Sequence, residues 1–145
     1  MAHHSLLSVR CDEDGRNKRV QVIHTGDTRT SGKGVIIDNL PLADFEDEWI
    51  QVETEMHYTH HGTFRIKLTR ISDGKVLADQ SFADIDLWRK GATSIRNKFG
   101  IYRSLGRKMQ SASDRPDNGL KDESLQLADF KVYEAHTNPN PQPHD

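Results

Sequence analysis

The chain contains a single cysteine, Cys11, among its 145 residues. An internal disulfide is therefore impossible, and so is a zinc site built on several cysteines. No apolar run approaches the roughly 18 residues that a membrane-spanning helix needs. The first residues, MAHHSLLSVRC, lack the charged and apolar regions of a secretory signal peptide. The sequence thus gives no indication of a membrane anchor, and it does not distinguish an oxidising from a reducing compartment.

Neither sign of charge dominates, since the chain has 20 Lys and Arg residues and 22 Asp and Glu residues, and its net charge is −2. This balance gives no reason to expect nucleic acid or an anionic membrane as partner. The length suits one domain with one core. The segment HTNPNPQPHD near the C-terminus is rich in proline, so we expect residues 135–145 to be a disordered tail behind a domain at 1–134.

Apolar residues recur with a period of two, which predicts strands rather than helices. The pattern is clearest at 49–58, where apolar residues at even positions alternate with polar ones. The sequence SDGK predicts a tight Asp-Gly turn. Many short strands with turn residues between them predict an all-β fold, an antiparallel β-sandwich or jelly roll. The other expected strands begin at Leu7 or cover 18–24, 34–40, 63–71, 76–82, 95–103 and 124–135, the last with a bulge.

The strands at 49–58 and 63–71 are expected to form a hairpin. If their apolar residues share a face, the sequence positions of the two residues in each cross-strand pair must sum to an even number. Pairing Tyr58 with Phe64 satisfies this and leaves a three-residue loop that ends at Gly62. Such loops need a residue with positive φ, which Gly62 can supply. The same register places Glu55 opposite Lys67, a favourable pair.

The expected strand at 95–103 carries a candidate site on one face. Side chains alternate along a strand, so Arg96, Lys98, Gly100 and Tyr102 would point the same way. The Cα atoms of Lys98 and Tyr102 would lie about 13 Å apart. Gly100 between them leaves a slot, and an interior glycine often marks the close approach of a ligand or another backbone. A solvated strand face is the alternative interpretation.

At these residues the chain resembles a known family. The Lys-x-Gly-x-Tyr core of NKFGIYRS resembles a strand of the jelly-roll polysaccharide lyases of the alginate-lyase and heparin- or glucuronan-lyase type. The hairpin at 47–77 resembles their central hairpin, and residues 125–135 resemble their closing strand. Taken in their order along the chain, the matching segments cover about residues 5 to 134. The resemblance implies a concanavalin A-like jelly roll, an extracellular location and carbohydrate binding.

The resemblance also implies an activity, β-elimination on a polysaccharide that contains uronic acid. In that family the tyrosine of this strand is the acid, sometimes also the base, and its lysine contacts substrate. These roles map to Tyr102 and Lys98 as catalytic residues. Arg96, Gly100 and Arg103 would contact the anionic polysaccharide. No cofactor or metal is implied.

One part of the family pattern is missing. The Gln-x-His strand and an arginine-bearing strand would precede the region that matches. We therefore expect a jelly roll that is incomplete at the N-terminus, with self-association through an exposed sheet edge. A non-catalytic carbohydrate-binding module and an inactive truncated lyase remain as alternatives.

Histidines and tryptophans outside the strand leave further alternatives. His57, His60 and His61 could suggest a metal site, but two adjacent histidines at a hairpin tip are more often exposed, and no carboxylate spacing completes a zinc set. Trp49 begins a strand, so packing is favoured over stacking on a sugar. Trp88 falls in an expected loop, where the two roles are equally favoured.

Overall fold

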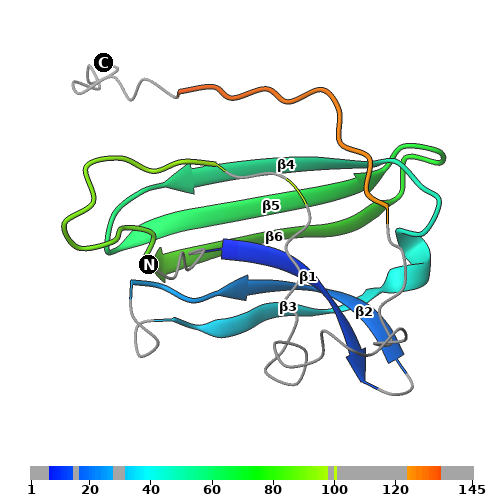
Figure 1. Ribbon diagram of the computed structural model, residues 1–145, viewed down its shortest axis with the longest axis horizontal. Helices are drawn as coiled ribbons and strands as arrows, with labels where there is room; N and C mark the ends of the chain where they lie inside the picture. The colour runs from blue at the N-terminus through cyan, green and yellow to red at the C-terminus, as the bar shows by residue number, and fades with distance from the viewer. Residues whose placement is uncertain (1–6, 15–16, 28–31, 98–99, 101–123, 135–145) are drawn as a thin grey trace, which may run out of the picture. The chain divides into compact units, whose positions relative to one another are not determined.

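The computed structural model of the chain describes residues 7–14, 17–27, 32–97, 100 and 124–134. Its contacts divide the chain into two units, Met1–Ser94 and Ile95–Asp145, and each is described by itself. The described part of the first unit is all-β, with two antiparallel sheets (Figure 1). None of its helices is long and apolar enough to cross a membrane.

The first sheet has the strand order β1-β2-β3. It consists of β1 (Leu7–Asp14), β2 (Asn17–His24) and β3 (Gly34–Pro41). β1 is longer than the sequence indicated, because it stays paired with β2 until its last residue. Val20 and Val22, predicted to share one face of β2, are only 4% and 1% exposed, but Gln21 between them is 2% exposed as well. A short 3-10 helix, Leu42–Asp44, follows β3.

The second sheet has the strand order β4-β5-β6. It consists of β4 (Ile50–His57), β5 (Gly62–Arg70) and β6 (Val76–Ile85). The predicted turn between β5 and β6 is confirmed, because Gly74 adopts a φ of 70°. The Arg70 amide closes this turn on the Lys75 carbonyl at 2.9 Å.

One hydrophobic core joins the two sheets. Its buried members come from β2, β3, β5 and β6 and from the segment that follows β6. β5 is the most regular contributor, because every second residue is buried along its first seven residues. Two sheets that share a core in this way have the character of a β-sandwich. The buried residues are Val20, Val22, Ile37, Leu40, Phe64, Ile66, Leu68, Ala78, Ile85 and Leu87.

The register of the β4–β5 hairpin differs from the prediction by two residues. Met56, not Tyr58, lies opposite Phe64, and Glu55 lies opposite Arg65 rather than Lys67. A shift of two preserves the side of the sheet on which each residue lies, so the predicted faces are right while the predicted pairs are wrong. The loop is longer than three residues, because pairing stops at His57 and Thr63.

The predicted role of Gly62 is also wrong. Gly62 does not have a positive φ; the described glycines that do are Gly26, Gly34, Gly74, Gly91 and Gly100. Instead, a β-carbon at Gly62 would overlap the carbonyl oxygen of His57 and lie 3.1 Å from that of Ile85. A glycine is needed here because the backbone passes close to its neighbours.

The apolar face of β4 is less covered than its alternation predicted. Val52 is 57% exposed, although it lies opposite Leu68, which is only 2% exposed. Thr54 is exposed as well. In the described part of the chain β4 pairs only with β5 and is therefore a sheet edge. An edge strand lacks a neighbour on one side, so alternation alone does not bury its apolar residues.

The described residues of the second unit contain no strand. Residues 95–97 begin the expected strand at 95–103 and are not in one, and Gly100 lies at a bend. Residues 124–134 do not form a strand either, so the strand predicted at 124–135 is wrong for them. An alternating pattern supplies apolar side chains, but a strand also needs a neighbouring strand with which its backbone can pair. Asp129, where the alternation slips, has a φ of 57°. Exposed apolar side chains here are Leu125, Leu127, Phe130, Val132 and Tyr133.

Candidate functional site

The structure describes two of the five site residues that the sequence predicted. Arg96 is exposed and lies outside any strand. Gly100 is exposed with a φ of 136°, and a β-carbon built there would meet open space. Lys98, Tyr102 and Arg103 lie outside the described residues. The slot formed by these residues therefore stays a prediction.

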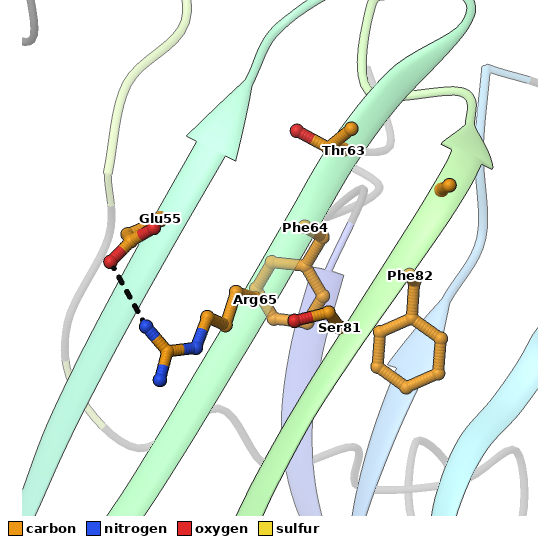
Figure 2. A pocket seen from close by; sticks show the side chains of 7 residues that line it. Glu55, Thr63, Phe64, Arg65, Ser81 and Phe82 are labelled. Carbon is orange, nitrogen blue, oxygen red and sulfur yellow. Dashed lines mark hydrogen bonds and ion pairs between the residues drawn. The ribbon is translucent and has the colours of Figure 1, made fainter.

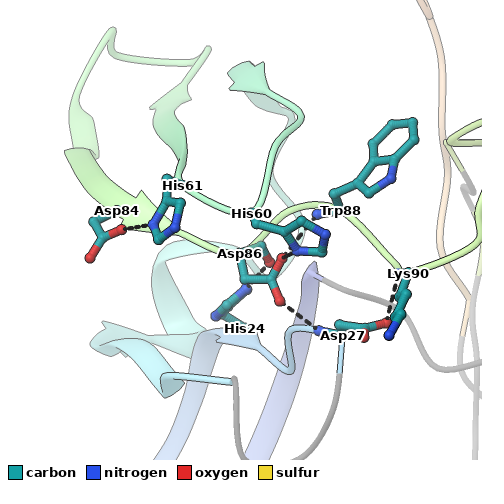
Figure 3. Close-up of polar contacts among 8 residues, drawn as sticks. All are labelled: His24, Asp27, His60, His61, Asp84, Asp86, Trp88 and Lys90. Carbon is teal, nitrogen blue, oxygen red and sulfur yellow. Dashed lines mark hydrogen bonds and ion pairs between the residues drawn. The ribbon is translucent and has the colours of Figure 1, made fainter.

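A cluster of polar side chains surrounds Asp86 in the first unit (Figure 3). Asp86 directly follows β6, and His60 comes from the loop between β4 and β5. Oδ1 of Asp86 lies 2.9 Å from Nδ1 of His60 and also accepts a hydrogen bond from the Trp88 amide at 3.3 Å. Its Oδ2 accepts one from the amide of Asp27, a residue that follows β2, at 3.3 Å. One carboxylate thus connects three segments of the chain.

The surroundings of Asp86 favour its ionised form. Burial by itself raises the pKa of this carboxyl. Hydrogen bonds from His60 and from the Trp88 and Asp27 amides lower the pKa by more than burial raises it, so the net pKa lies below the ordinary value. An ionised carboxylate only accepts hydrogen bonds, so Nδ1 of His60 is the donor. When the imidazole is neutral, its lone pair then lies on Nε2.

A second histidine supports Asp86 from within the protein. His24 is fully buried at the end of β2. Its Nε2 lies 2.6 Å from the Asp86 carbonyl oxygen, and its Nδ1 accepts a hydrogen bond from the Lys33 amide at 3.1 Å. Both ring nitrogens are thus occupied, so His24 has a structural role in holding β2 against the segment after β6.

His61 forms a similar pair with Asp84, but in a different environment. Nδ1 of His61 lies 2.7 Å from Oδ1 of Asp84, and the two side chains are 87% and 78% exposed. The hydrogen bond from His61 lowers the pKa of Asp84. By contrast, Asp86 is only 15% exposed and His60 is 53% exposed. The expectation of exposed loop histidines therefore fits His61 better than His60.

A hollow of about 270 Å³ lies beside His60 and is lined by Tyr58, Thr59, His60 and Trp88. Tyr58 is half-buried, and this burial raises the pKa of its hydroxyl. Trp88 is partly exposed, and Figure 3 shows its indole directed away from Asp86. Two aromatic rings and an imidazole thus line one open surface.

A second hollow, of about 300 Å³, lies over β4, β5 and β6 (Figure 2). Among the described residues that line it, Arg65 is the one cation, and it lies 3.4 Å from Glu55. Arg65 also donates two hydrogen bonds of 3.1 Å to Asp79, which raise the pKa of Arg65 and lower that of Asp79. Because this cation is already paired twice, the hollow beside His60 is the better candidate for a ligand.

Sequence reasoning noticed His60 and Trp88 but not Asp86, which brings them together. Nothing in the local sequence marks Asp86, because its partners His24 and Asp27 are 62 and 59 positions away. No group of histidine, cysteine and acidic residues within the described ranges is arranged to hold a metal ion. No family model, curated protein or solved structure matches the chain.

Proposed function

We propose that this chain binds a polysaccharide containing uronic acid and acts on it as the jelly-roll polysaccharide lyases do, by β-elimination. The observation that carries the proposal is the Lys-x-Gly-x-Tyr core at 98–102, in a chain whose first unit is, in its described part, all-β with two sheets around one core. Within this proposal the two sheets belong to a concanavalin A-like jelly roll.

The predicted residues supply part of the chemistry that such a reaction needs. Cations at Arg96, Lys98 and Arg103 would neutralise the uronate carboxylate, which makes the C5 proton removable. A base takes that proton, its electron pair forms the C4–C5 double bond, and the bond from C4 to the glycosidic oxygen breaks. Tyr102 would give its proton to the departing oxygen.

A second candidate function is carbohydrate binding without cleavage. The hollow lined by Tyr58, His60 and Trp88 favours it, because sugar sites commonly combine an aromatic surface with a few polar groups. An inactive truncated lyase, with neither binding nor turnover, is the remaining alternative.

The test measures binding and turnover on the same substrates. Calorimetry with alginate, polygalacturonate and glucuronan reports affinity, and ultraviolet absorbance reports the unsaturated product of β-elimination. Absorbance that grows with time on one polyuronate supports the lyase. Binding without absorbance supports the carbohydrate-binding module, and the absence of both on all three polymers contradicts the proposal.

A further inference from the structure

We propose that Trp88, His60 and Lys90 form a subsite that binds one acidic sugar ring of a polysaccharide. The assignment rests on the proposed function for the class of ligand. The contacts that carry it, however, are made by residues of the first unit and not by those of the predicted slot. It can therefore fail or succeed separately.

Trp88 supplies the surface on which the ring lies. Its backbone is held by the hydrogen bond from its amide to Asp86 at 3.3 Å, while its side chain stays partly exposed and lines the hollow. An indole that packing leaves accessible presents a flat apolar face. The C–H groups on one side of a pyranose ring bury apolar area against such a face, and the hydroxyls at the rim stay free for polar contacts.

His60 supplies an oriented polar group at the edge of that surface. Its Nδ1 is held by the Asp86 carboxylate at 2.9 Å, and no contact among the described residues uses its Nε2 (Figure 3). The carboxylate, itself fixed by two backbone amides, determines the direction of the ring before any ligand arrives. A preoriented group loses little conformational freedom on binding, so Nε2 can accept a hydrogen bond from a sugar hydroxyl at low entropic cost.

Lys90 supplies the charge that selects an acidic sugar. It is exposed, follows Trp88 by two residues, and is anchored by the hydrogen bond of its amide to Oδ1 of Asp27 at 3.2 Å. Within the described ranges its ammonium group has no ion pair. Lys90 does not line the hollow itself, so its exposed side chain would have to extend to the rim of the Trp88 surface to meet a uronate carboxylate.

The experiment uses the full chain and four hexasaccharides, derived from alginate, polygalacturonate, glucuronan and, as a neutral probe, cellulose. The chain has two tryptophans, so Trp49→Phe leaves Trp88 as the only indole emitter. In that background, fluorescence titration reports on Trp88 directly, and calorimetry gives the affinity. His60→Asn removes Nε2 while its amide nitrogen can still donate to Asp86. His61→Asn is the matched control, because it alters the neighbouring histidine–aspartate pair outside the hollow.

We expect at least one acidic hexasaccharide to shift the Trp88 emission. Trp88→Ala should weaken its binding by about tenfold in a well-folded protein, the effect of a lost stacking contact. His60→Asn should weaken it about three- to tenfold, the usual scale of one hydrogen bond. Lys90→Gln should reduce both affinity and its dependence on salt. His61→Asn should leave affinity unchanged, and circular dichroism melts confirm folding of each variant.

Three outcomes would overturn part or all of the assignment. If an acidic hexasaccharide binds equally well to wild type, Trp88→Ala and His60→Asn, the subsite is wrong while the proposed function stands. If only the cellulose hexasaccharide binds, in a manner that depends on Trp88, the uronate class and the role of Lys90 are wrong. If none of the four binds at millimolar concentration, the subsite and the proposed function both fail.

Discussion

A β-carbon on Gly62 would overlap the carbonyl oxygen of His57, so the two residues can approach as they do only because Gly62 has no side chain. The same β-carbon would lie 3.1 Å from the Ile85 carbonyl oxygen and 3.2 Å from that of Thr59. Gly62 is buried, begins β5 and pairs with Ile85 at the end of β6. This close contact is where the hairpin loop that carries His60 joins the sheet.

Gly62→Ala should therefore lower the free energy of unfolding by about 1–3 kcal/mol, the usual cost of extra volume in a packed site. Urea denaturation measures the change. Gly74→Ala is the control, since its φ is 70° but a β-carbon there meets nothing within 4 Å. We expect Gly74→Ala to cost less, and Gly74→Asn to recover part of that loss because Asn tolerates positive φ. An equal loss at both glycines would contradict the role of close contact at Gly62.

Val52 and Leu68 lie opposite each other but should respond very differently to substitution. Leu68→Ala should cost about 2–5 kcal/mol, because Leu68 is 2% exposed and its removal leaves a cavity. Val52→Lys should change the free energy of unfolding by less than about 0.5 kcal/mol, because Val52 is 57% exposed. Urea denaturation compares the two variants.

The same Val52→Lys substitution tests the expected self-association. A charge on an exposed edge strand hinders pairing with another chain. Sedimentation velocity should show less association for Val52→Lys than for wild type, while Ile71→Lys, an exposed turn substitution, should have little effect. Identical association in all three proteins would show that the β4 edge is not the surface involved.

Asp73 should contribute its full stabilisation only above about pH 4 and lose it progressively between about pH 4 and 2. Its carboxylate accepts hydrogen bonds from Arg70 at 3.0 and 2.6 Å and from the Lys75 amide at 3.0 Å, and the Arg70 bond above all lowers its pKa from 3.8 to about 2. When a carboxyl has a lower pKa in the folded protein than in the unfolded one, its stabilisation of the fold is complete at pH values above the unfolded-state pKa. This stabilisation is lost as the pH falls to the folded-state pKa. Denaturation curves between pH 5 and 2 test this.

In those curves, Asp73→Asn should lose less stability than wild type between about pH 4 and 2, and the difference should shrink in salt because the pair is exposed. Ser72→Ala, a change at the neighbouring exposed position, should follow wild type. If the pH dependence of Asp73→Asn matches that of wild type, the Arg70–Asp73 pair does not stabilise the fold in this way.

Tyr102→Phe tests the catalytic part of the proposed function. The change keeps the ring and removes only the hydroxyl. In an active lyase it should leave affinity for the polyuronate nearly intact and lower turnover by about 10²–10⁴, the usual scale for a lost acid–base group. Calorimetry and ultraviolet absorbance measure the two effects. Full turnover in Tyr102→Phe would show that Tyr102 is not the catalytic acid.

The strands of the two sheets could be predicted because their information is local. Alternating residues identify β2 and β5, and the Asp73-Gly74 sequence identifies the turn before β6. The parity rule also predicted correctly which faces β4 and β5 share. It could not distinguish registers that differ by two residues, because both satisfy the same alternation. The pair Met56–Phe64 follows from how the chain turns between the strands, where Gly62 lies close to the carbonyl oxygen of His57.

What the sequence by itself determined is which residues alternate and where the chain turns, since both depend on residues close together. Burial and the candidate site depend on the tertiary structure. Val52 has the pattern of a core residue and is exposed, because covering a face takes another layer. The Asp86 cluster exists only because the ends of β2 and β6 and the loop after β4 meet, and residues up to 62 positions apart supply its hydrogen bonds. Contacts over that distance in sequence leave no local pattern, so only the packing of the two sheets brings His60, Asp86 and Trp88 together.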